Sequence, residues 1–562
     1  MEQCITAKNC CHGTPVTRVV DNRNLGIAVI HYQRHPDTSH LTDMQISRHQ
    51  YDARGFLHKS RDPRLDASKE ANFTWLGGLT ANRLYTRSVD SGDAIALSDI
   101  ADRPLVTVSQ LSTDPTGDQS TSQAVTLSYW YEPAKLPGRL IAASEQAAGD
   151  APRLSERYLY AAPNAKATGR NLAGLCTHHY HTAGLLQMER VALTGMNQSA
   201  VQRLLVGADD PAAFTDWQGE DEDSWNKQLV TPDRAHASLA TGDATGTHVT
   251  FIDACGHLQA QTYDIAGQLS GKTLTLHGQA QQVIVKALAY AATGETLFEE
   301  QGNGVSSRYT YEPRTQRMAS VRTERAAAGH DRASLIQYLR YTYDPVGNVA
   351  SVVNDAQATR YWRNQQVEPR NTFRYDSLYQ LVQVKGREMA NRGQQGVELP
   401  PVGGDDQTAY SNYTRSYAYD TAGNLLRIRH SAPASNNCYS IDITVSDRSN
   451  RAVLGTLASQ PEQVEAQFTV GGQQHRLQPG QTLAWTHRAE LRSVTPINRE
   501  GDEDDFEHYR YDGYRQRLLK ITTQLTSSGL QITICALSAR PGIAQHGSRR
   551  HRDRGSADDP GG

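Results

Sequence analysis

Apolar and polar residues alternate at every second position through most of this chain, in short segments separated by turn-forming residues. Residues 26–32 (Gly-Ile-Ala-Val-Ile-His-Tyr), 105–108 (Leu-Val-Thr-Val) and 125–131 (Val-Thr-Leu-Ser-Tyr-Trp-Tyr) are typical. Because successive side chains of a strand point to opposite faces, this pattern predicts β-strands. Segments with helical spacing are few, and 387–395 is the best short helix prediction. We therefore expect a mainly β protein.

One phrase recurs at the predicted turns, and residues 343–349 (Tyr-Asp-Pro-Val-Gly-Asn-Val) carry it in full. The Tyr suits a pleated, half-buried surface. The Asp can accept hydrogen bonds from backbone N–H groups just downstream, and the Gly takes the positive φ that other residues resist. A closing Val or Leu returns the chain to a strand, so each copy predicts a β-hairpin. The residues that we expect to form these structural turns are Tyr51, Asp52, Gly55, Tyr263, Asp264, Gly267, Tyr343, Asp344, Gly347, Tyr375, Asp376, Tyr419, Asp420 and Gly423.

Further copies at 251–258 and 511–518, and divergent ones at 179–186, 290–297 and 311–314, extend the repeat to much of the chain. A strict propeller or solenoid would keep a constant period, and these copies do not. Loops of varied length between hairpins, such as 398–408, explain the irregular spacing.

The composition favours an extended, thin-walled β structure. The hydrophobic fraction is 38%, the mean hydropathy is −0.60, and 26 Tyr stand against 8 Phe. Tyr has an apolar body and a polar tip, so it fits sheets whose faces meet water or a partner.

Charge, cysteine content and hydropathy exclude several classes. The formal net charge of −3 gives no reason to expect nucleic acid or an acidic membrane as a partner. The 7 Cys are scattered and odd in number, so reduced thiols are expected rather than a disulfide framework. No basic stretch precedes an apolar run near Met1, and no window is long and apolar enough for a membrane span.

The neighbours of the repeats carry a more specific resemblance. Residues 48–52 (Arg-His-Gln-Tyr-Asp) and 60–65 (Ser-Arg-Asp-Pro-Arg-Leu) resemble the opening of the TccC-type (TcC) component of bacterial insecticidal toxin complexes, an RHS-repeat (YD-repeat) protein. The resemblance covers about 15–533. Further matches follow in family order at 343–349, 375–381, 386–391 and 446–454.

The resemblance implies a structural role. In this family the RHS part and a TcB-type partner form a hollow β-shell, or cocoon, built as a spiral sheet of YD-repeat hairpins. The shell encloses a toxic C-terminal effector, which an aspartyl autoprotease cuts free, and it docks on a TcA-type pore. The resemblance therefore implies a wall that is not an enzyme, needs no cofactor and does not itself enter the membrane. It also implies synthesis in a bacterial cytoplasm without a Sec signal and secretion within a toxin complex.

The predicted organisation has three parts. Residues 1–14 are expected to be a flexible lead and 15–533 the shell region. The polar segment 534–562 lacks apolar periodicity and is expected to be an unrelated, disordered tail. The resemblance ends near Ile534, so the autoprotease and effector portions would be missing and the chain would be a truncated or frame-shifted form.

No catalytic, cofactor or metal site is predicted. The most metal-like cluster is Cys176, His178, His179 and His181. Alternation in a strand splits these side chains between two faces, so a structural strand is the better interpretation. The short set at 10–12 (Cys-Cys-His) lacks paired ligand spacing, and the repeated Asp residues are interpreted as turn formers rather than acid–base catalysts.

Two other functions remain open. A YD-repeat adhesin or carbohydrate-binding surface protein would carry a signal or anchor. A hydrolase would need a clustered nucleophile or metal site, and His178 and His181 would be the residues to test.

Overall fold

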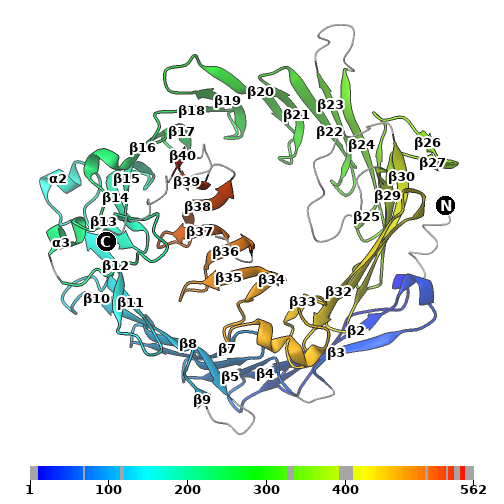
Figure 1. The fold of residues 1–562 in the computed structure, drawn as a ribbon, viewed down its shortest axis with the longest axis horizontal. Coiled ribbons are helices and arrows are strands. Elements are labelled where there is room, and N and C mark those ends of the chain that lie inside the picture. The colour runs from blue at the N-terminus through cyan, green and yellow to red at the C-terminus, as the bar shows by residue number, and fades with distance from the viewer. Residues whose placement is uncertain are drawn as a thin grey trace, which may run out of the picture.

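The computed structural model describes residues 10–66, 70–113, 119–219, 221–325, 334–390, 409–499, 504–526, 529–536 and 545–550. Figure 1 shows strands arranged around an open centre, with a smaller sheet inside the ring. The predicted mainly β fold is confirmed. Among the described residues, no helix is long and apolar enough to cross a membrane.

The wall of the ring is a 31-stranded sheet in which neighbouring strands pair antiparallel. Its strands are β1 (Thr17–Val20), β2 (Gly26–Gln33), β3 (Asp43–Tyr51), β4 (Leu57–Arg61), β5 (Phe73–Gly77), β6 (Arg83–Ser88), β7 (Gly92–Ser98), β8 (Pro104–Thr113), β9 (Gln119–Ser120), β10 (Val125–Tyr131), β11 (Leu140–Ala147), β12 (Arg153–Tyr160), β13 (Cys176–His181), β14 (Gly184–Val191), β15 (Asn197–Leu204), β16 (His236–Gly242), β17 (His248–Ile252), β18 (Leu258–Tyr263), β19 (Leu269–Thr275), β20 (Gln282–Tyr290), β21 (Thr296–Gln301), β22 (Val305–Tyr311), β23 (Met318–Arg325), β24 (Leu335–Tyr343), β25 (Val349–Asn354), β28 (Arg370–Tyr375), β29 (Leu381–Met389), β30 (Tyr410–Tyr419), β31 (Leu425–Ala432), β32 (Asn437–Val445) and β33 (Ala452–Leu454).

The inner sheet has seven strands and crosses the interior of the ring towards β12–β16 (Figure 1). Its strands are β34 (Arg476–Gln478), β35 (Gln481–Trp485), β36 (Leu491–Ile497), β37 (Asp505–Tyr511), β38 (Arg517–Thr526), β39 (Gly529–Ala536) and β40 (Gln545–Arg550). The remaining elements are short: β26 (Arg360–Trp362), β27 (Gln365–Val367), α2 (Ala165–Thr168), α3 (Glu222–Asn226), η1 (Pro36–Thr38), η2 (Pro232–Arg234), η3 (Pro433–Ser435), η4 (Pro461–Gln463) and η5 (Glu465–Gln467).

The antiparallel order gives the wall two different rims. Turns alternate from one edge to the other because each strand reverses the direction of the last. The turns 52–55, 264–267, 344–347, 376–379 and 420–423 therefore all lie on one edge, which we call the YD rim. The loops that join β2 to β3, β4 to β5 and β6 to β7 lie on the other edge, the opposite rim.

The main hydrophobic cluster joins the wall to the inner sheet. Tyr180, Trp217 and Trp225 from the wall pack with Leu519 and Ile521 of β38. The other clusters are small. Most wall strands are therefore only half-buried, which agrees with the low hydrophobic fraction of the sequence.

The helix prediction at 387–395 was wrong for its first residues. They belong to β29, where Arg387 faces Asn412 and Met389 faces Tyr410 of β30. Pairing with a long neighbouring strand overrides the weak local helical spacing. Residues 391–395 lie outside the described residues.

The predicted ends of the chain contain more structure than expected. Cys10 is buried and its Sγ donates to the Arg34 carbonyl at 2.9 Å, so the described part of the lead is attached to the wall. β39 continues to Ala536 and pairs with β40 at 545–550, where no structure was expected. Residues 537–544 and 551–562 lie outside the described residues, so the three-part division stays a prediction.

Replacing Trp217 tests the junction between the wall and the inner sheet. Trp217 is fully buried, with its ring 5.2 Å from Tyr180. We expect Trp217→Ala to lower the free energy of unfolding by about 3–5 kcal/mol, because it removes a large side chain from the main cluster. Urea unfolding of Trp217→Ala and of the exposed-site control Trp130→Ala measures this. Equal losses in the two variants would contradict the assignment of the main core to this junction.

Candidate functional site

Each Tyr-Asp copy folds into a turn that its Asp side chain holds together. In the 343–349 copy, the Asp344 N–H donates to the Asn348 carbonyl at 2.9 Å and the Gly347 N–H to the Asp344 carbonyl at 3.1 Å. Asp344 Oδ1 accepts from the backbone N–H of Val346, Gly347 and Asn348. Gly347 has φ +111°, and the pairing slips just before Tyr343. This is a type I turn followed by a glycine bulge, which suits a right-twisted hairpin.

The other predicted turns share this chemistry. In every one, Oδ1 of the Asp accepts the backbone N–H groups two and four residues downstream, and the residue at the glycine position has positive φ. The Asp residues are Asp52, Asp264, Asp376 and Asp420, and the positive-φ residues are Gly55, Gly267, Tyr379 and Gly423.

The Tyr of each copy links its hairpin to the preceding one. The Tyr343 hydroxyl donates to the carbonyl of Met318, the first residue of β23, at 2.7 Å. In each further case the acceptor is again the first residue of the paired strand that comes before it in the chain, which is β8 for Tyr131 and β25 for Tyr375. These links are Tyr51 to Gly26, Tyr131 to Pro104, Tyr160 to Leu140, Tyr263 to His248, Tyr290 to Leu269, Tyr311 to Thr296, Tyr375 to Val349, Tyr419 to Leu381 and Tyr511 to Leu491.

Sequence reasoning missed this link, although a signal was present. It explained Tyr by its fit to a pleated surface, which Phe shares, whereas only Tyr has the hydroxyl that reaches the neighbouring carbonyl. The preference for Tyr at this position of the repeat, within a chain of 26 Tyr and 8 Phe, was the usable signal.

Arginines make a second series of links along the YD rim. Each extends from one turn to a backbone carbonyl of the next. The pairs are Arg23 to Asp52 (3.0 Å), Arg54 to Gly78 (2.9 Å), Arg103 to Gly138 (2.6 Å), Arg139 to Gly174 (2.8 Å) and Arg317 to Val346 (2.9 Å). The turns of the rim are thus fixed relative to one another as well as internally.

The ring closes where the YD rim of a late hairpin meets the opposite rim of an early one. The Ser377 N–H donates to the Arg34 carbonyl at 3.1 Å, and the Arg34 N–H donates to Ser377 Oγ at 2.7 Å. Gln33 Nε2 donates to Asp376 Oδ2 at 3.2 Å, and Asp376 is only 2% exposed. Figure 1 shows β2 and β3 beside the late wall strands.

A second set of contacts continues this closure. The Asn450 N–H donates to Asp90 Oδ1 at 2.7 Å, and Arg451 Nη2 donates to the Asp90 carbonyl at 2.9 Å. Arg64 forms an ion pair with Asp420 at 3.5 Å. Where the wall meets itself, turns of the YD rim therefore stack on loops of the opposite rim, and this contact is not made by strand pairing.

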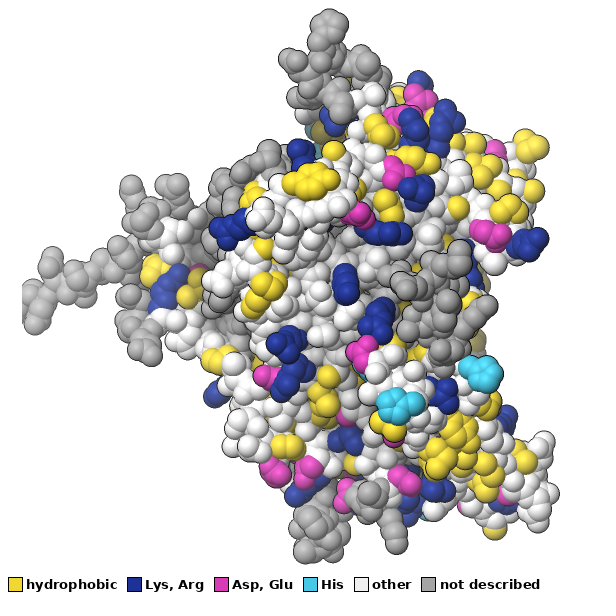
Figure 2. Space-filling model, turned by 90° about the vertical axis from the view of Figure 1, so that its right-hand side faces the viewer, with side chains coloured by type: hydrophobic (Ala, Val, Ile, Leu, Met, Phe, Trp, Pro, Cys, Tyr) yellow, Lys and Arg dark blue, Asp and Glu magenta, His cyan; other side chains and the backbone are white. Residues whose placement is uncertain are grey.

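The face over this closure carries intermixed charges. Figure 2 shows basic, acidic and apolar side chains distributed over it, without a large area of one charge sign. The Arg374–Asp37 ion pair, 2.8 Å long, joins β28 to η1. No single-sign field marks this face as a nucleic-acid surface.

Inside the ring, a buried polar cluster binds the inner sheet to the wall. Arg488, in the turn between β35 and β36, forms ion pairs with Glu145 of β11 and Glu156 of β12. Its Nη2 donates to Ser155 Oγ at 2.8 Å. Glu156 Oε2 lies 2.6 Å from Nε2 of His179. The cluster replaces water around Arg488 with paired acceptors, which is the condition for burying charge.

The pKa values in this cluster follow from burial and pairing. Burial favours the neutral form of Glu156, but the His179 hydrogen bond and the Arg488 charge outweigh it and lower the pKa to about 2. Burial likewise opposes the charge of Arg488, but Glu156 and Glu145 raise its pKa above the usual value. Burial and the neighbouring His179 lower the pKa of His181 to about 3.

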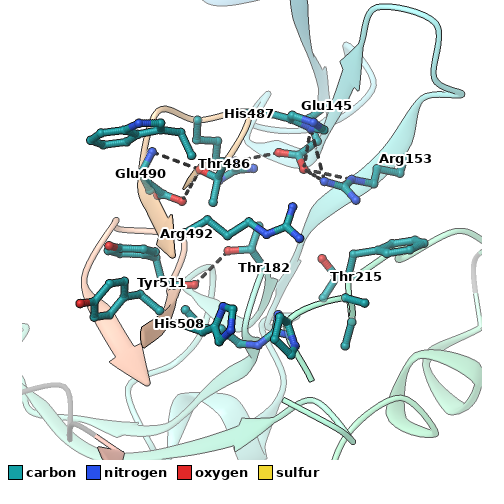
Figure 3. Close-up of a pocket in the computed structure, with 18 of the residues that line it drawn as sticks. Glu145, Arg153, Thr182, Thr215, Thr486, His487, Glu490, Arg492, His508 and Tyr511 are labelled. Carbon is teal, nitrogen blue, oxygen red and sulfur yellow. Dashed lines mark hydrogen bonds and ion pairs between the residues drawn. The ribbon is translucent and has the colours of Figure 1, made fainter. Parts of the chain in front are cut away.

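Beside this cluster, Figure 3 shows a cavity of about 330 Å³ between the inner sheet and the wall. Arg492 and His508 point into it from the inner sheet, and the Thr182 hydroxyl donates to the Tyr511 carbonyl at 2.9 Å. The Thr182–Tyr511 contact and the ion pairs of Arg488 attach the inner sheet to the wall here.

The structure does not bring the predicted metal-like cluster together. His179 and His181 lie edge-on at 5.5 Å, whereas His178 stacks near Tyr180. His179 is engaged by Glu156 and His181 by the Ala183 N–H. Each of these three histidines therefore has a structural partner.

Comparisons with known proteins give consistent matches. A family model described as the tripartite Tc toxins repeat matches residues 436–480. Toxin subunit YenC2 of Yersinia entomophaga is 48% identical over 523 residues, which cover 92% of this chain and 54% of YenC2. Toxin subunit YenC1 of the same organism is 45% identical over 525 residues, covering 92% of this chain and 52% of YenC1. The chain spans about half the length of these curated relatives.

Solved structures agree with the wall fold. The TcdB2–TccC3 crystal structure matches 95% of this chain and 25% of that chain, with a TM-score of 0.86 and 44% identity. A Photorhabdus luminescens Tc holotoxin pore structure matches 96% of this chain and 24% of that chain, with a TM-score of 0.87 and 43% identity.

Removing one tyrosine hydroxyl tests the link between hairpins. We expect Tyr343→Phe to lower the free energy of unfolding by about 0.5–1.5 kcal/mol, because the Met318 carbonyl loses its donor while the ring remains. Urea unfolding measures the change. The matched control is Tyr361→Phe, since Tyr361 is exposed on β26. An unchanged free energy of unfolding in Tyr343→Phe would show that the hydroxyl link adds no stability.

Acidification tests the buried polar cluster. The unfolded chain protonates His181 below about 6.5, but the folded protein does so only near 3, so stability falls as pH drops through this window. Glu156, with a folded pKa of about 2 against an ordinary 4.5, adds a further loss below about 4.5. Between pH 6.5 and 4.5 we expect a shallower loss in His181→Gln than in the parent, measured by urea unfolding. The exposed control His40→Gln should retain the parent slope, and an unchanged slope in His181→Gln would contradict this assignment.

Proposed function

This chain is a homologue of the TcC-type subunits of Tc toxins over 92% of its length, and on that premise we propose that it is a wall segment of a hollow toxin shell. The shell would enclose a toxic effector, and the assembled complex would deliver it through a TcA-type pore. The role is structural: the chain encloses cargo and carries out no reaction of its own. Its site of action would be outside the producing cell, within the secreted complex.

The observation that carries this proposal is the ring itself. Hairpins linked along the YD rim by Tyr hydroxyls surround an open centre, and turn-on-loop stacking closes the ring (Figure 1). A repeated, locally linked hairpin can extend a curved wall without a thick core. This is the property that an enclosing shell needs.

The closure also supports a shell partner of TcB type. At the closure, the YD rim of late hairpins stacks on the opposite rim of early ones, as Ser377 does on Arg34. The YD rim of the early hairpins has the same turn chemistry and could stack on an equivalent rim of another RHS chain. Apolar side chains at the tips of its turns are exposed; they are Leu79, Ile100, Leu193 and Ile265. Exposed apolar residues along one edge suit an edge that a partner covers.

Co-expression with a TcB-type subunit tests the proposal. The wild-type chain is expected to co-purify with the partner, and electron microscopy of the particles should show a closed shell with a cavity. A chain that never associates with the partner, or a full-size complex without a cavity, would overturn the proposal.

A rim variant tests the docking edge. We expect the combined change of Leu79, Ile100, Leu193 and Ile265 to Ser to weaken association at least tenfold, since each buried Leu or Ile contributes about 1.5–3 kcal/mol. The matched control changes Leu41 and Val206, which are exposed on opposite-rim loops, to Ser. Circular dichroism confirms that both variants fold. Equal association of the rim variant and the wild type would exclude the YD rim as the partner edge while leaving the shell proposal intact.

A further inference from the structure

A turn on the opposite rim gathers side chains that bind metal ions. Asp253, Cys255 and His257 lie in the turn between β17 and β18, and each offers one ligand atom within 4.8 Å of the others. None of these side chains takes part in the closure, the tyrosine links or the inner-sheet cluster. The sequence pattern predicted this turn only as a copy of the repeat, so its Asp-x-Cys-x-His spacing was given no chemical role.

The turn is held in shape before any ion binds. Asp253 Oδ1 accepts the N–H groups of Cys255 and His257, both at 2.9 Å. Asp253 is only 6% exposed, and no ion pair joins it to a Lys or Arg among the described residues. Both turn hydrogen bonds use Oδ1 of Asp253. A buried carboxylate without a cationic partner is costly, so this position favours a bound cation.

A second imidazole, that of His277, lies next to the turn but outside the group of ligand atoms within 4.8 Å of one another. The His277 N–H, in the turn after β19, donates to Nδ1 of His257 at 3.0 Å. A Cβ placed on Gly256 would lie 2.9 Å from Nδ1 of His277, so the His277 ring covers the middle of the 253–257 turn. Gly256 also has φ +78°, so this position favours glycine both for its conformation and for the space that His277 occupies.

We propose that Asp253, Cys255 and His257 hold a zinc ion and that the neighbouring His277 ring turns towards it as the fourth ligand. A thiolate, two imidazoles and one carboxylate are a donor set that zinc accepts in tetrahedral geometry. On binding, Cys255 Sγ forms a bond to the ion and its thiol proton passes to solvent. His257 gives a nitrogen lone pair, and where this is Nδ1 the ion takes the place of the His277 N–H. No electron transfer is involved.

The site would link two neighbouring hairpins at the opposite rim. The tyrosine hydroxyl links described above act at the YD rim, where the Tyr263 hydroxyl reaches His248. A zinc ion shared by the 253–257 turn and His277 would join the β17–β18 and β19–β20 connections at the other edge. The inference does not depend on the proposed function, because it concerns only ligands within this chain.

Cobalt binding to the purified, chelator-treated full chain tests the site. Co²⁺ is the probe because a tetrahedral thiolate complex has a near-ultraviolet charge-transfer band and strong visible bands, and Zn²⁺ should displace it. We expect one Co²⁺ per chain, loss of the charge-transfer band in Cys255→Ser, and at least tenfold weaker binding in His277→Ala. Zn²⁺ should raise the melting temperature of the wild type but not of Cys255→Ser.

Two matched variants control for other thiols. Cys438→Ser removes an exposed thiol elsewhere on the wall, and Cys11→Ser interrupts the Cys-Cys-His set near the N-terminus. Both should retain the band. Retention of the band in Cys255→Ser, or its loss in Cys11→Ser alone, would overturn the proposal. The melting temperature of each metal-free variant shows whether it is folded, so a failure to bind can be separated from a failure to fold.

Discussion

The hydrogen bond from a Tyr hydroxyl to the carbonyl of the preceding hairpin is the interaction on which this wall depends. Backbone hydrogen bonds pair neighbouring strands, but they do not fix the distance between neighbouring turns at a rim. Hydrophobic packing adds little there, because few hydrophobic clusters support this single sheet. The Tyr343 hydroxyl fixes its turn to the start of β23, and the same bond recurs around the ring. Each such bond adds about 1 kcal/mol, and repetition makes the sum significant.

The copies that depart from the repeat mark the places where the wall meets something distant. In the Asp376 copy, Tyr379 replaces the glycine and adopts φ +66°, which costs about 1 kcal/mol or more. That turn closes the ring through Ser377. In the copy at 511–518, Arg515 takes the positive φ and Gly513 lies against the wall, where a Cβ would lie 2.2 Å from His179. In this copy the glycine is therefore at position 513, where a small residue is needed, and not at position 515, where the backbone has positive φ.

Local chemistry explains why some of this was predictable. The turns, including Asp344 and Gly347, could be predicted because all of their hydrogen bonds form within five residues. The ring closure could not, because Gln33 and Asp376 are 343 residues apart, and the repeat motif of Asp376 specifies its own turn but no distant partner. The inner sheet was missed for the same reason: Arg488 is an ordinary turn residue until Glu145 and Glu156 lie beside it. At 387–389 local spacing favoured a helix, and pairing with β30 decided otherwise.

Contacts between neighbouring hairpins and contacts between distant segments together suggest an order of assembly. Hairpin-to-hairpin contacts join segments that are close in sequence, so they form at low entropic cost as the chain lengthens. The ring closure of Arg34 with Ser377 joins segments hundreds of residues apart through polar contacts. The inner sheet adds the ion pair of Arg488 with Glu156 to the hydrophobic cluster around Trp217. Polar contacts between preformed edges give directional fit with modest net energy. A wall built this way can grow as an open ribbon and close last.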